Sequence, residues 1–183
     1  SLIELTDGSI AFCGNANGNN TDVSPNIPTI YNITGRFDNN GNMLWIKRHR
    51  YFYWESGYPM QGMIATSNSL ISIVGDAVMK ISQTDGTLLG PQKVFAAAGQ
   101  FSSIERKNDL VILYTANAQL VLDTNLTVIK GFQYTTADPT RTLTLKGFSS
   151  ESGRFMQGDA MTVSGDNFSY LAEFDENGKV IQA

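Results

Sequence analysis

Apolar strands and tight polar turns alternate along the whole chain. Runs of Val, Ile, Leu and Phe are interrupted by pairs such as Asp-Gly and Asn-Gly, which tolerate the backbone angles of short hairpin turns. One strand–turn–strand phrase occurs four times, at 36–45, 80–89, 121–129 and 173–181. The apolar residues before these turns lie about 40 to 50 residues apart, a period typical of propeller blades and other stacked units. These residues are Phe37, Ile81, Leu122 and Phe174.

A second hairpin phrase precedes each copy of the first, at 3–12, 63–73, 104–113 and 148–156. Each repeat therefore offers four strands. The pattern predicts an all-β fold of the β-propeller class, with about four four-stranded antiparallel blades. The blades are expected at approximately 1–50, 60–96, 100–136 and 143–183. Three residues are expected on buried strands: Ile73, Val111 and Phe155.

The first and last strands of the chain do not combine to form a shared blade. The first repeat begins with a strand at Ser1, the last ends with a strand near Ala183, and no blade is visibly completed by both termini. We therefore expect residues 1–183 to form one propeller segment of a larger ring or array, and not a closed monomer. Further blades or another chain should cover the exposed sheet at either end.

Charge and hydropathy exclude two classes of partner. The chain has 13 Lys and Arg against 17 Asp and Glu, for a net charge of −4, and its basic residues are dispersed except at 47–50. Nucleic-acid binding normally needs a basic stripe that contacts several phosphates, so we predict no nucleic-acid partner. No apolar run approaches the length of a membrane span, so we also predict no membrane span.

The first repeat carries a resemblance to a known family. Segment 5–14 reads Leu-Thr-Asp-Gly-Ser-Ile-Ala-Phe-Cys-Gly, and segment 37–47 reads Phe-Asp-Asn-Asn-Gly-Asn-Met-Leu-Trp-Ile-Lys. This combination resembles the bacterial β-propeller repeats found in secreted and surface proteins, although Leu126 replaces the turn glycine in the third repeat. The resemblance implies a propeller fold and an extracellular or cell-surface location. It implies no particular activity, because propellers host unrelated functions.

The chain also resembles, less closely, the propeller repeat of quinoprotein enzymes. Such an enzyme would hold its cofactor beside metal-binding carboxylates, and these cannot be identified in this sequence, so we predict no cofactor. Three aspartates at the hairpin turns have a structural explanation, because their carboxylates can accept backbone N–H groups within the turn. They are Asp38, Asp123 and Asp175.

Candidate catalytic and metal-binding residues are sparse. The single Cys13 and the single His49 lie in different segments, and a lone cysteine is most often a small packed residue. We predict no catalytic residues. Two Asn-rich loops, 15–22 and 38–42, offer alternating oxygen ligands for calcium, but both lack the dense carboxylates and closing Glu of a strong loop. We therefore predict no metal site.

The candidate ligand-binding residues lie in two loops. The aromatic segment 51–58 contains Trp54 and Tyr58, beside the loop-forming Gly57 and Pro59, and aromatic faces can stack on sugars or anchor a protein partner. The alternative is that these aromatic residues fill the interface between the first two blades. The second loop supplies amide and carboxylate groups for a protein or carbohydrate surface: Asn15, Asn17 and Asp22.

Four glycosylation sequons are present, which matter in a eukaryotic secreted protein. The two later acceptors lie at or beside predicted turns and are expected to be accessible. The acceptors are Asn19, Asn32, Asn125 and Asn167.

Three functions from different classes follow from the sequence. The first is a non-catalytic extracellular or surface module for binding or adhesion, which uses the loops of the propeller. The second is a structural scaffold in a larger surface or viral assembly, which should show a flat apolar patch on its outer strands. The third is a fragment of a propeller enzyme, a quinoprotein or a hydrolase, whose active site lies outside this segment.

Overall fold

A computed structural model gives the backbone of most of the chain. The described residues are 1–19, 28–49, 60–134, 141–150, 153–162, 167–174 and 180–182, and side chains are described for 1–15, 32–49 and 62–134.

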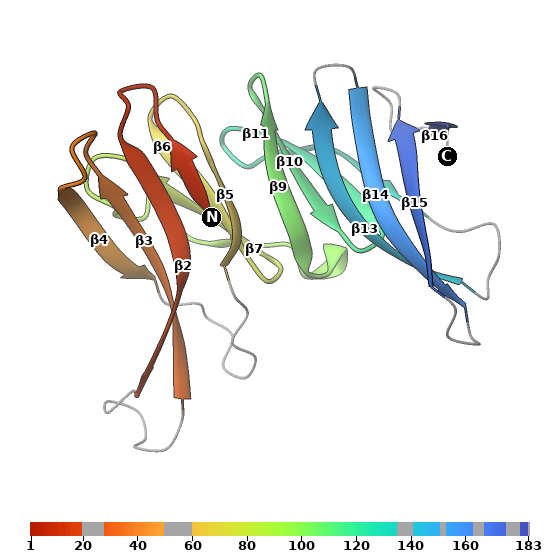
Figure 1. Cartoon of the computed structure of the whole chain (residues 1–183), viewed down its shortest axis with the longest axis horizontal. Coiled ribbons are helices and arrows are strands. Elements are labelled where there is room, and N and C mark those ends of the chain that lie inside the picture. The colour runs from red at the N-terminus through yellow and green to blue at the C-terminus, as the bar shows by residue number, and fades with distance from the viewer. Residues whose placement is uncertain are drawn as a thin grey trace. The chain divides into compact units, whose positions relative to one another are not determined.

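The chain is all-β, as predicted, with four four-stranded antiparallel sheets (Figure 1). In each sheet, strands that follow one another in the sequence are hydrogen-bonded neighbours, which is the order of a propeller blade. The one helical element among the described residues is a short 3-10 turn at Ala96–Ala98. No helix in this part of the chain is long and apolar enough to cross a membrane.

The strands of the first two sheets lie in residues 1–94. The first sheet contains β1 (Leu2–Glu4), β2 (Ile10–Asn19), β3 (Pro28–Phe37) and β4 (Met43–His49). The second contains β5 (Met60–Ala65), β6 (Ser69–Val74), β7 (Ala77–Ser82) and β8 (Lys93–Val94).

The remaining strands form the third and fourth sheets. The third contains β9 (Phe101–Lys107), β10 (Leu110–Thr115), β11 (Ala118–Asp123) and β12 (Val128–Gln133). The fourth contains β13 (Arg141–Ser150), β14 (Gly153–Thr162), β15 (Asn167–Phe174) and β16 (Val180–Gln182). The chain divides into two compact units, Ser1–Val94 and Phe95–Ala183, which are described separately below.

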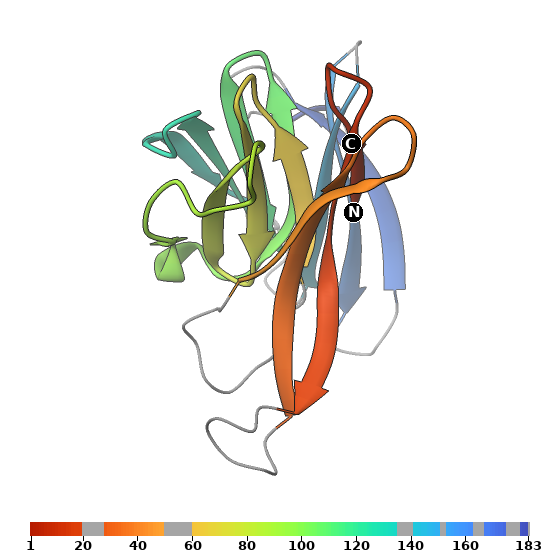
Figure 2. The ribbon, with the colours of Figure 1, turned by 90° about the vertical axis from the view of Figure 1, so that its left-hand side faces the viewer.

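The first and second sheets pack face to face in the first unit. β5 lies beside β1 and β2 (Figure 2). The inner face of the first sheet contributes Ala11, Cys13 and Trp45 to a shared apolar core. The second sheet contributes Met63, Leu70, Val74, Met79 and Ile81. The predicted packing of sheets through their faces is confirmed here.

The second sheet is buried more completely than the first. All six residues of β6 are buried, although successive side chains of a strand point to opposite faces. Both faces of this strand are therefore covered, and the predicted burial of Ile73 is confirmed.

In the second unit, β9 and β10 lie beside β13. β10 is buried from Val111 to Thr115, which confirms the expectation for Val111. The hydroxyl of Tyr114 donates a hydrogen bond of 2.7 Å to Glu105 Oε1, so this buried aromatic residue has a polar partner. Phe155 is on β14, and its side chain lies outside the described residues.

Two hairpin turns are stabilised by the same aspartate geometry. Asp38 Oδ1 accepts the backbone N–H groups of Asn40 at 2.9 Å and Asn42 at 2.8 Å. Asp123 Oδ1 accepts those of Asn125 at 2.9 Å and Thr127 at 2.8 Å. The predicted structural role of these aspartates is confirmed, whereas Asp175 lies outside the described residues.

Candidate binding groove

The turn after β7 is fixed to the first sheet through one backbone carbonyl. The carbonyl oxygen of Gln83 accepts hydrogen bonds from Arg36 Nη1 at 2.8 Å and from the indole N–H of Trp45 at 3.0 Å. The side-chain amide of Gln83 donates to the carbonyl of Thr66 at 2.8 Å. Strands β3 and β4 of one sheet and two turns of the next are therefore held by a single residue.

Arg36 extends this network to the first turn of the chain. Its Nε donates to Ser9 Oγ at 2.8 Å, and its guanidinium forms an ion pair with Asp7. Asp7 also accepts hydrogen bonds from the Ser9 hydroxyl at 2.6 Å and the Ser9 N–H at 3.1 Å. The bonds from Ser9, together with the charge of Arg36, lower the pKa of the Asp7 carboxyl.

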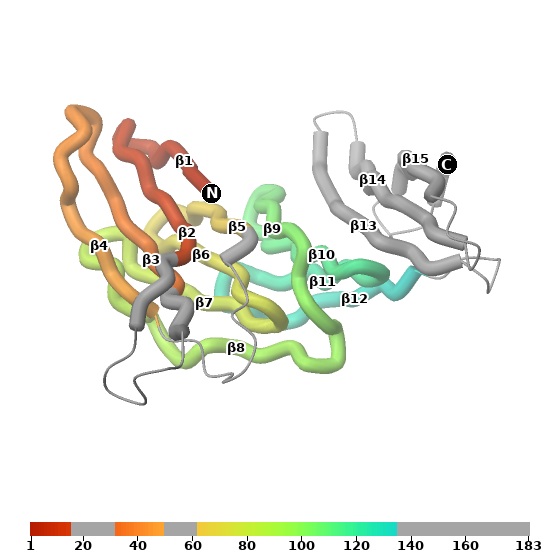
Figure 3. Tube along the Cα trace, turned by 60° about the horizontal axis from the view of Figure 1, so that its bottom comes forward, coloured from red at the N-terminus to blue at the C-terminus, as the bar shows by residue number. Residues whose placement is uncertain are grey.

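This network positions the connection from β7 to β8 opposite the outer strand of the first sheet (Figure 3). Between them lies an open groove of about 650 Å³. Its volume is within the range of sites that hold small molecules or peptide side chains. The β4 side includes Lys47 and Arg48, and the opposite side includes Leu88, Pro91 and Val94.

The two sides of the groove differ in chemistry. Leu88 and Val94 are 41% and 47% exposed, so apolar surface is available on the connection. The β4 side carries the positive charge of Lys47, which acts on Asp85 in the facing turn. The pKa of the Asp85 carboxyl is lowered mainly by hydrogen bonds from Ser82 and Thr87 and further by the charge of Lys47. The groove suits a ligand that combines an acidic group with an apolar one.

His49 lines the end of this groove but is poorly placed for proton transfer. The side chain is buried, and its Nε2 lies 2.6 Å from Thr34 Oγ1. Burial lowers the imidazole pKa, and the charge of Lys47 lowers it further. The ring is therefore neutral at pH 7, with one nitrogen already bonded to Thr34.

Cys13 is a packed core residue, as predicted. It is 5% exposed and belongs to the core between the first two sheets. Burial raises the pKa of its thiol, which disfavours the thiolate needed for nucleophilic chemistry.

The residues predicted to bind a ligand are only partly described. Asn15 is exposed on β2, and Asn17 is on the same strand with its side chain outside the described residues. Asp22, Trp54 and Tyr58 lie outside the described residues altogether. Their role in binding stays a prediction.

The sequons occupy different environments. Asn125 is exposed in the turn after β11. Asn32 is 2% exposed on β3, and its neighbour in the register on β4 is His49. A glycan has no room at Asn32 in the folded sheet, so the expectation of an acceptor site fails there. Asn19 and Asn167 lie at strand ends, and their side chains are not among those described.

Metal ligands do not gather in the described part of the chain. No group of three or more His, Cys, Asp or Glu residues that could hold a metal ion occurs there. In the 38–42 loop, Asp38 Oδ1 accepts two backbone N–H groups and Oδ2 accepts from Asn42 Nδ2 at 2.9 Å. These oxygens stabilise the turn.

Sequence reasoning missed the groove and its supporting residues. Lys47 and Arg48 were visible as a basic run, but the run gave no sign of a facing apolar connection. Gln83 acts mainly through its backbone carbonyl, which any residue possesses, so its side chain gave no signal. The Asp85-Gly86 pair did predict the turn that contributes to the opposite side.

Comparisons with known proteins give distant likenesses only. No family model and no curated protein matches the chain. Among solved structures, it is similar to BamB from Moraxella catarrhalis at 12% identity and a TM-score of 0.48, over 86% of this chain and 49% of that one. It is similar to a Bacteroides caccae protein of unknown function at 9% identity and a TM-score of 0.49, over 93% of this chain and 71% of that one. It is also similar to the Neurospora crassa Pan2 WD40 domain at 11% identity and a TM-score of 0.44, over 84% of this chain and 61% of that one.

The chain thus spans about half the length of the BamB chain it matches. Likenesses this distant carry no conclusion about activity or partner. The description of the chain as an all-β protein with four blade-like sheets rests on its own strand pairing.

Proposed function

We propose that this chain is a non-catalytic recognition module that binds another protein outside the cell or at the cell surface. The groove between β4 and the 86–94 connection is the observation that carries the proposal. The location is proposed from the resemblance of segments 5–14 and 37–47 to repeats of secreted and surface proteins.

An extended peptide segment is the ligand that best suits the groove. β4 is an outer strand of its sheet, and among the described strands it pairs with β3 alone. A partner strand can add to such an edge through backbone hydrogen bonds, while its alternate side chains enter neighbouring pockets. Lys47 favours acidic side chains in the partner, and Leu88 and Val94 favour apolar ones.

The proposal that the module is non-catalytic is supported by the state of its two most reactive side-chain types. Cys13 is buried with a raised thiol pKa, and His49 is buried with a lowered imidazole pKa and a bond to Thr34. Neither is arranged with a second group as nucleophile and base.

Selection from a library of random linear peptides displayed on phage, with the intact chain as target, tests the groove directly. We expect enriched peptides to combine acidic and apolar residues. Their affinity, measured by calorimetry with synthetic copies, should fall about tenfold or more in Lys47→Glu, because that change reverses the charge on one side of the groove. Binding should also weaken as salt is raised.

Lys107→Glu is the matched control, since Lys107 is an exposed lysine on β9 in the second unit. Equal effects of the two charge reversals would contradict the groove as the binding site. A glycan array probed with the same protein tests the carbohydrate alternative. Binding on that array, together with a failed peptide selection, would overturn the proposal of a protein ligand.

A scaffold role is a second candidate, and a separate observation favours it. The face of the first sheet that points away from the second sheet is apolar and exposed, with Leu2 at 73% and Ile46 at 53%. A flat apolar patch is the feature that sequence reasoning associated with assembly.

A further inference from the structure

The backbone of β4 alternates between groups bonded to β3 and groups directed at the edge of the sheet. The hairpin that joins the two strands is closed by the Asp38 N–H, which donates to the Asn42 carbonyl at 2.9 Å. Alternate residues of a strand direct their N–H and C=O groups to the same side, so Arg36 and Thr34 also bond to β4. Their register partners on β4 are Trp45 and Lys47.

A second bond gives the same alternation independently. The Cys13 N–H donates to the Ser1 carbonyl at 3.0 Å, so Phe12 directs its backbone groups the other way, to β3. Phe12 pairs with Gly35, and Gly35 pairs with Ile46. Because the backbone groups of Gly35 bond to Phe12, those of Ile46 point away from β3. They are directed at the edge of the sheet, where β4 has no other neighbour among the described strands.

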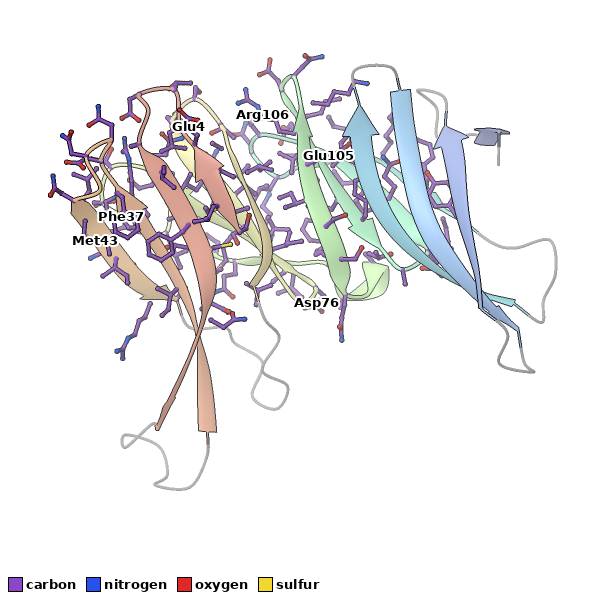
Figure 4. All side chains as sticks on the ribbon, viewed as in Figure 1. Glu4, Phe37, Met43, Asp76, Glu105 and Arg106 are labelled. Atoms are coloured by element: carbon purple, nitrogen blue, oxygen red, sulfur yellow. The ribbon has the colours of Figure 1, made fainter. Side chains whose placement is uncertain are left out.

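A β-bulge ends this regular edge on one side. Phe37 pairs with Met43, whereas Arg36 pairs with Trp45. Met43 and Leu44 therefore both oppose Phe37. Figure 4 labels Phe37 and Met43 at this bulge. Since a bulge bends the strand and interrupts the ladder, a further strand can pair with residues 45–49 and not with the part of β4 nearer the turn.

The groove lies on the inner face of this edge. Lys47 shares a register row with Thr34 and Cys13, and Cys13 belongs to the core between the first two sheets. Lys47 therefore points to the inner face, as does His49 two residues later, and both line the groove. Trp45 points the same way, but the turn after β7 covers it and leaves it 9% exposed. A strand added to β4 would direct every second side chain to this face, into the groove beside Lys47 and His49.

The connection that faces β4 passes Trp45 first and reaches Val94 last. A Cβ at Gly86 would lie 2.5 Å from the Trp45 ring and 2.8 Å from Lys47 Cγ, so the connection begins beside these two residues. Val94 pairs with Ala77, at the opposite end of β7. The groove therefore has the lysine near the bulge and the exposed apolar surface of Val94 toward the end of β4.

We infer that the peptide bound in the groove adds to β4 as an antiparallel strand in one register, centred on Ile46. This inference rests on the proposed function. The peptide residue opposite Ile46, the anchor residue, exchanges two backbone hydrogen bonds with it. Antiparallel pairing is the arrangement of every described strand pair in the four sheets.

This register predicts the sequence of the peptide. The residue directly before the anchor lies opposite Lys47 and points into the groove, so it is acidic. The residue three before the anchor lies opposite His49, toward the apolar end of the groove, so it is apolar. The residue after the anchor lies opposite Trp45, where the turn after β7 already covers the inner face, so it is small. From its N-terminus the peptide therefore reads apolar, any residue, acidic, anchor, small.

N-methylation of a selected peptide, one amide at a time, tests the register on the intact wild-type chain. At the anchor it should lower the affinity measured by calorimetry about tenfold or more, because it removes the bond to the Ile46 carbonyl and places a methyl group in the ladder. The residues on either side of the anchor are the matched controls. Their N–H groups point away from β4, so N-methylation there should lower affinity less than about threefold.

Ile46→Pro tests the same pairing from the protein side. Proline lacks an N–H, and the loss of an outward N–H leaves the ladder between β3 and β4 intact. Ile46→Pro should therefore stay folded by circular dichroism and bind the peptide about tenfold less tightly. Ile46→Ala keeps the N–H and should lower affinity less than about threefold. Lys47→Pro removes an N–H that bonds to β3, so it should lower the melting temperature more than Ile46→Pro does.

The outcomes separate this inference from the proposed function. If no peptide is enriched, the proposed function fails and the register fails with it. If peptides bind and depend on Lys47, but no amide is sensitive to N-methylation or the acidic residue follows the anchor, the groove stands and the register is overturned. A larger loss of stability in Ile46→Pro than in Lys47→Pro would overturn the alternation of the edge. The peptide scan needs no protein variant, so it decides the register even where Ile46→Pro does not fold.

Discussion

The indole of Trp45 covers Gly86 so closely that a Cβ at position 86 would lie 2.5 Å from the ring carbon Cε3. Trp45 is on the outer strand of the first sheet, and Gly86 is in the turn after β7 of the second. Gly86 also has a φ of +74°, a conformation that disfavours side chains. This contact and the bond from the indole to Gln83 place the turn against β4.

Gly86→Ala should therefore destabilise the chain through backbone strain and through a steric clash with the indole, whereas Gly41→Ala should cause backbone strain alone. Gly41 has a φ of +84° with nothing within 4 Å of an added Cβ, so its substitution costs only backbone strain, about 1 kcal/mol. Gly86→Ala adds a steric cost of about 1–3 kcal/mol. Urea unfolding of both variants measures the difference. Equal losses of stability would contradict the packing of the indole on the turn.

Arg36 is expected to stabilise the contact between the first two sheets. Arg36→Met keeps the aliphatic stem and removes the bonds to Gln83, Ser9 and Asp7, which should lower the free energy of unfolding by about 2 kcal/mol. Asp7→Asn should cost less, because the side chain of Asp7 is 57% exposed. Chemical unfolding of each variant gives both values. A larger effect of Asp7→Asn would show that the bond to Gln83 contributes little.

Stability should fall with pH as His49 titrates. Its pKa is lowered in the folded chain, so the unfolded state binds the proton more readily. The neutral ring contributes stability above the unfolded pKa of about 6.5, and this contribution is lost progressively as pH falls below it. Denaturant unfolding from pH 7.5 to about 5 should show this loss in the wild type and not in His49→Gln. The pKa values of Asp7, Asp38 and Asp85 are lowered, so these carboxyls protonate at a lower pH, outside this window.

The buried side chain of Leu126 is expected to stabilise the chain by more than its strained backbone conformation destabilises it. It is 4% exposed and has a φ of +64°. Both Leu126→Gly and Leu126→Ala lose about 2 kcal/mol of apolar burial, but glycine relieves the strain that alanine retains. The alanine variant should therefore be less stable by about 1 kcal/mol in urea unfolding. The reverse order would mean that the strain is negligible.

Much of the fold could be predicted because it depends on local turn chemistry. The Asp-Asn-Asn-Gly sequence after Phe37 and the Asp-Thr-Asn-Leu sequence after Leu122 both form the predicted turn. In each turn the aspartate carboxylate accepts two backbone N–H groups, as its predicted structural role requires. Leu126 shows why the third repeat can lack the turn glycine of the first: a buried leucine contributes apolar contact that a turn glycine lacks.

The candidate groove could not be predicted, because it depends on distant parts of the chain. Lys47 and Leu88 are 41 residues apart in the sequence. They line one groove in a region where Arg36 and Trp45 both bond to the carbonyl of Gln83 and hold the turn after β7 against the first sheet. A single sequence shows which strands exist and where they turn. It does not show which face of one sheet meets which turn of the next.

The buried position of Asn32 sets an order of events in any cell that adds glycans to growing polypeptides. Its amide is accessible only until β3 is packed, because the folded sheet leaves it 2% exposed. Modification and folding at this sequon are therefore mutually exclusive outcomes of a kinetic competition. In such a cell, the glycosylated fraction at Asn32 would report how slowly the first sheet forms, with the exposed Asn125 as an internal reference for transfer efficiency.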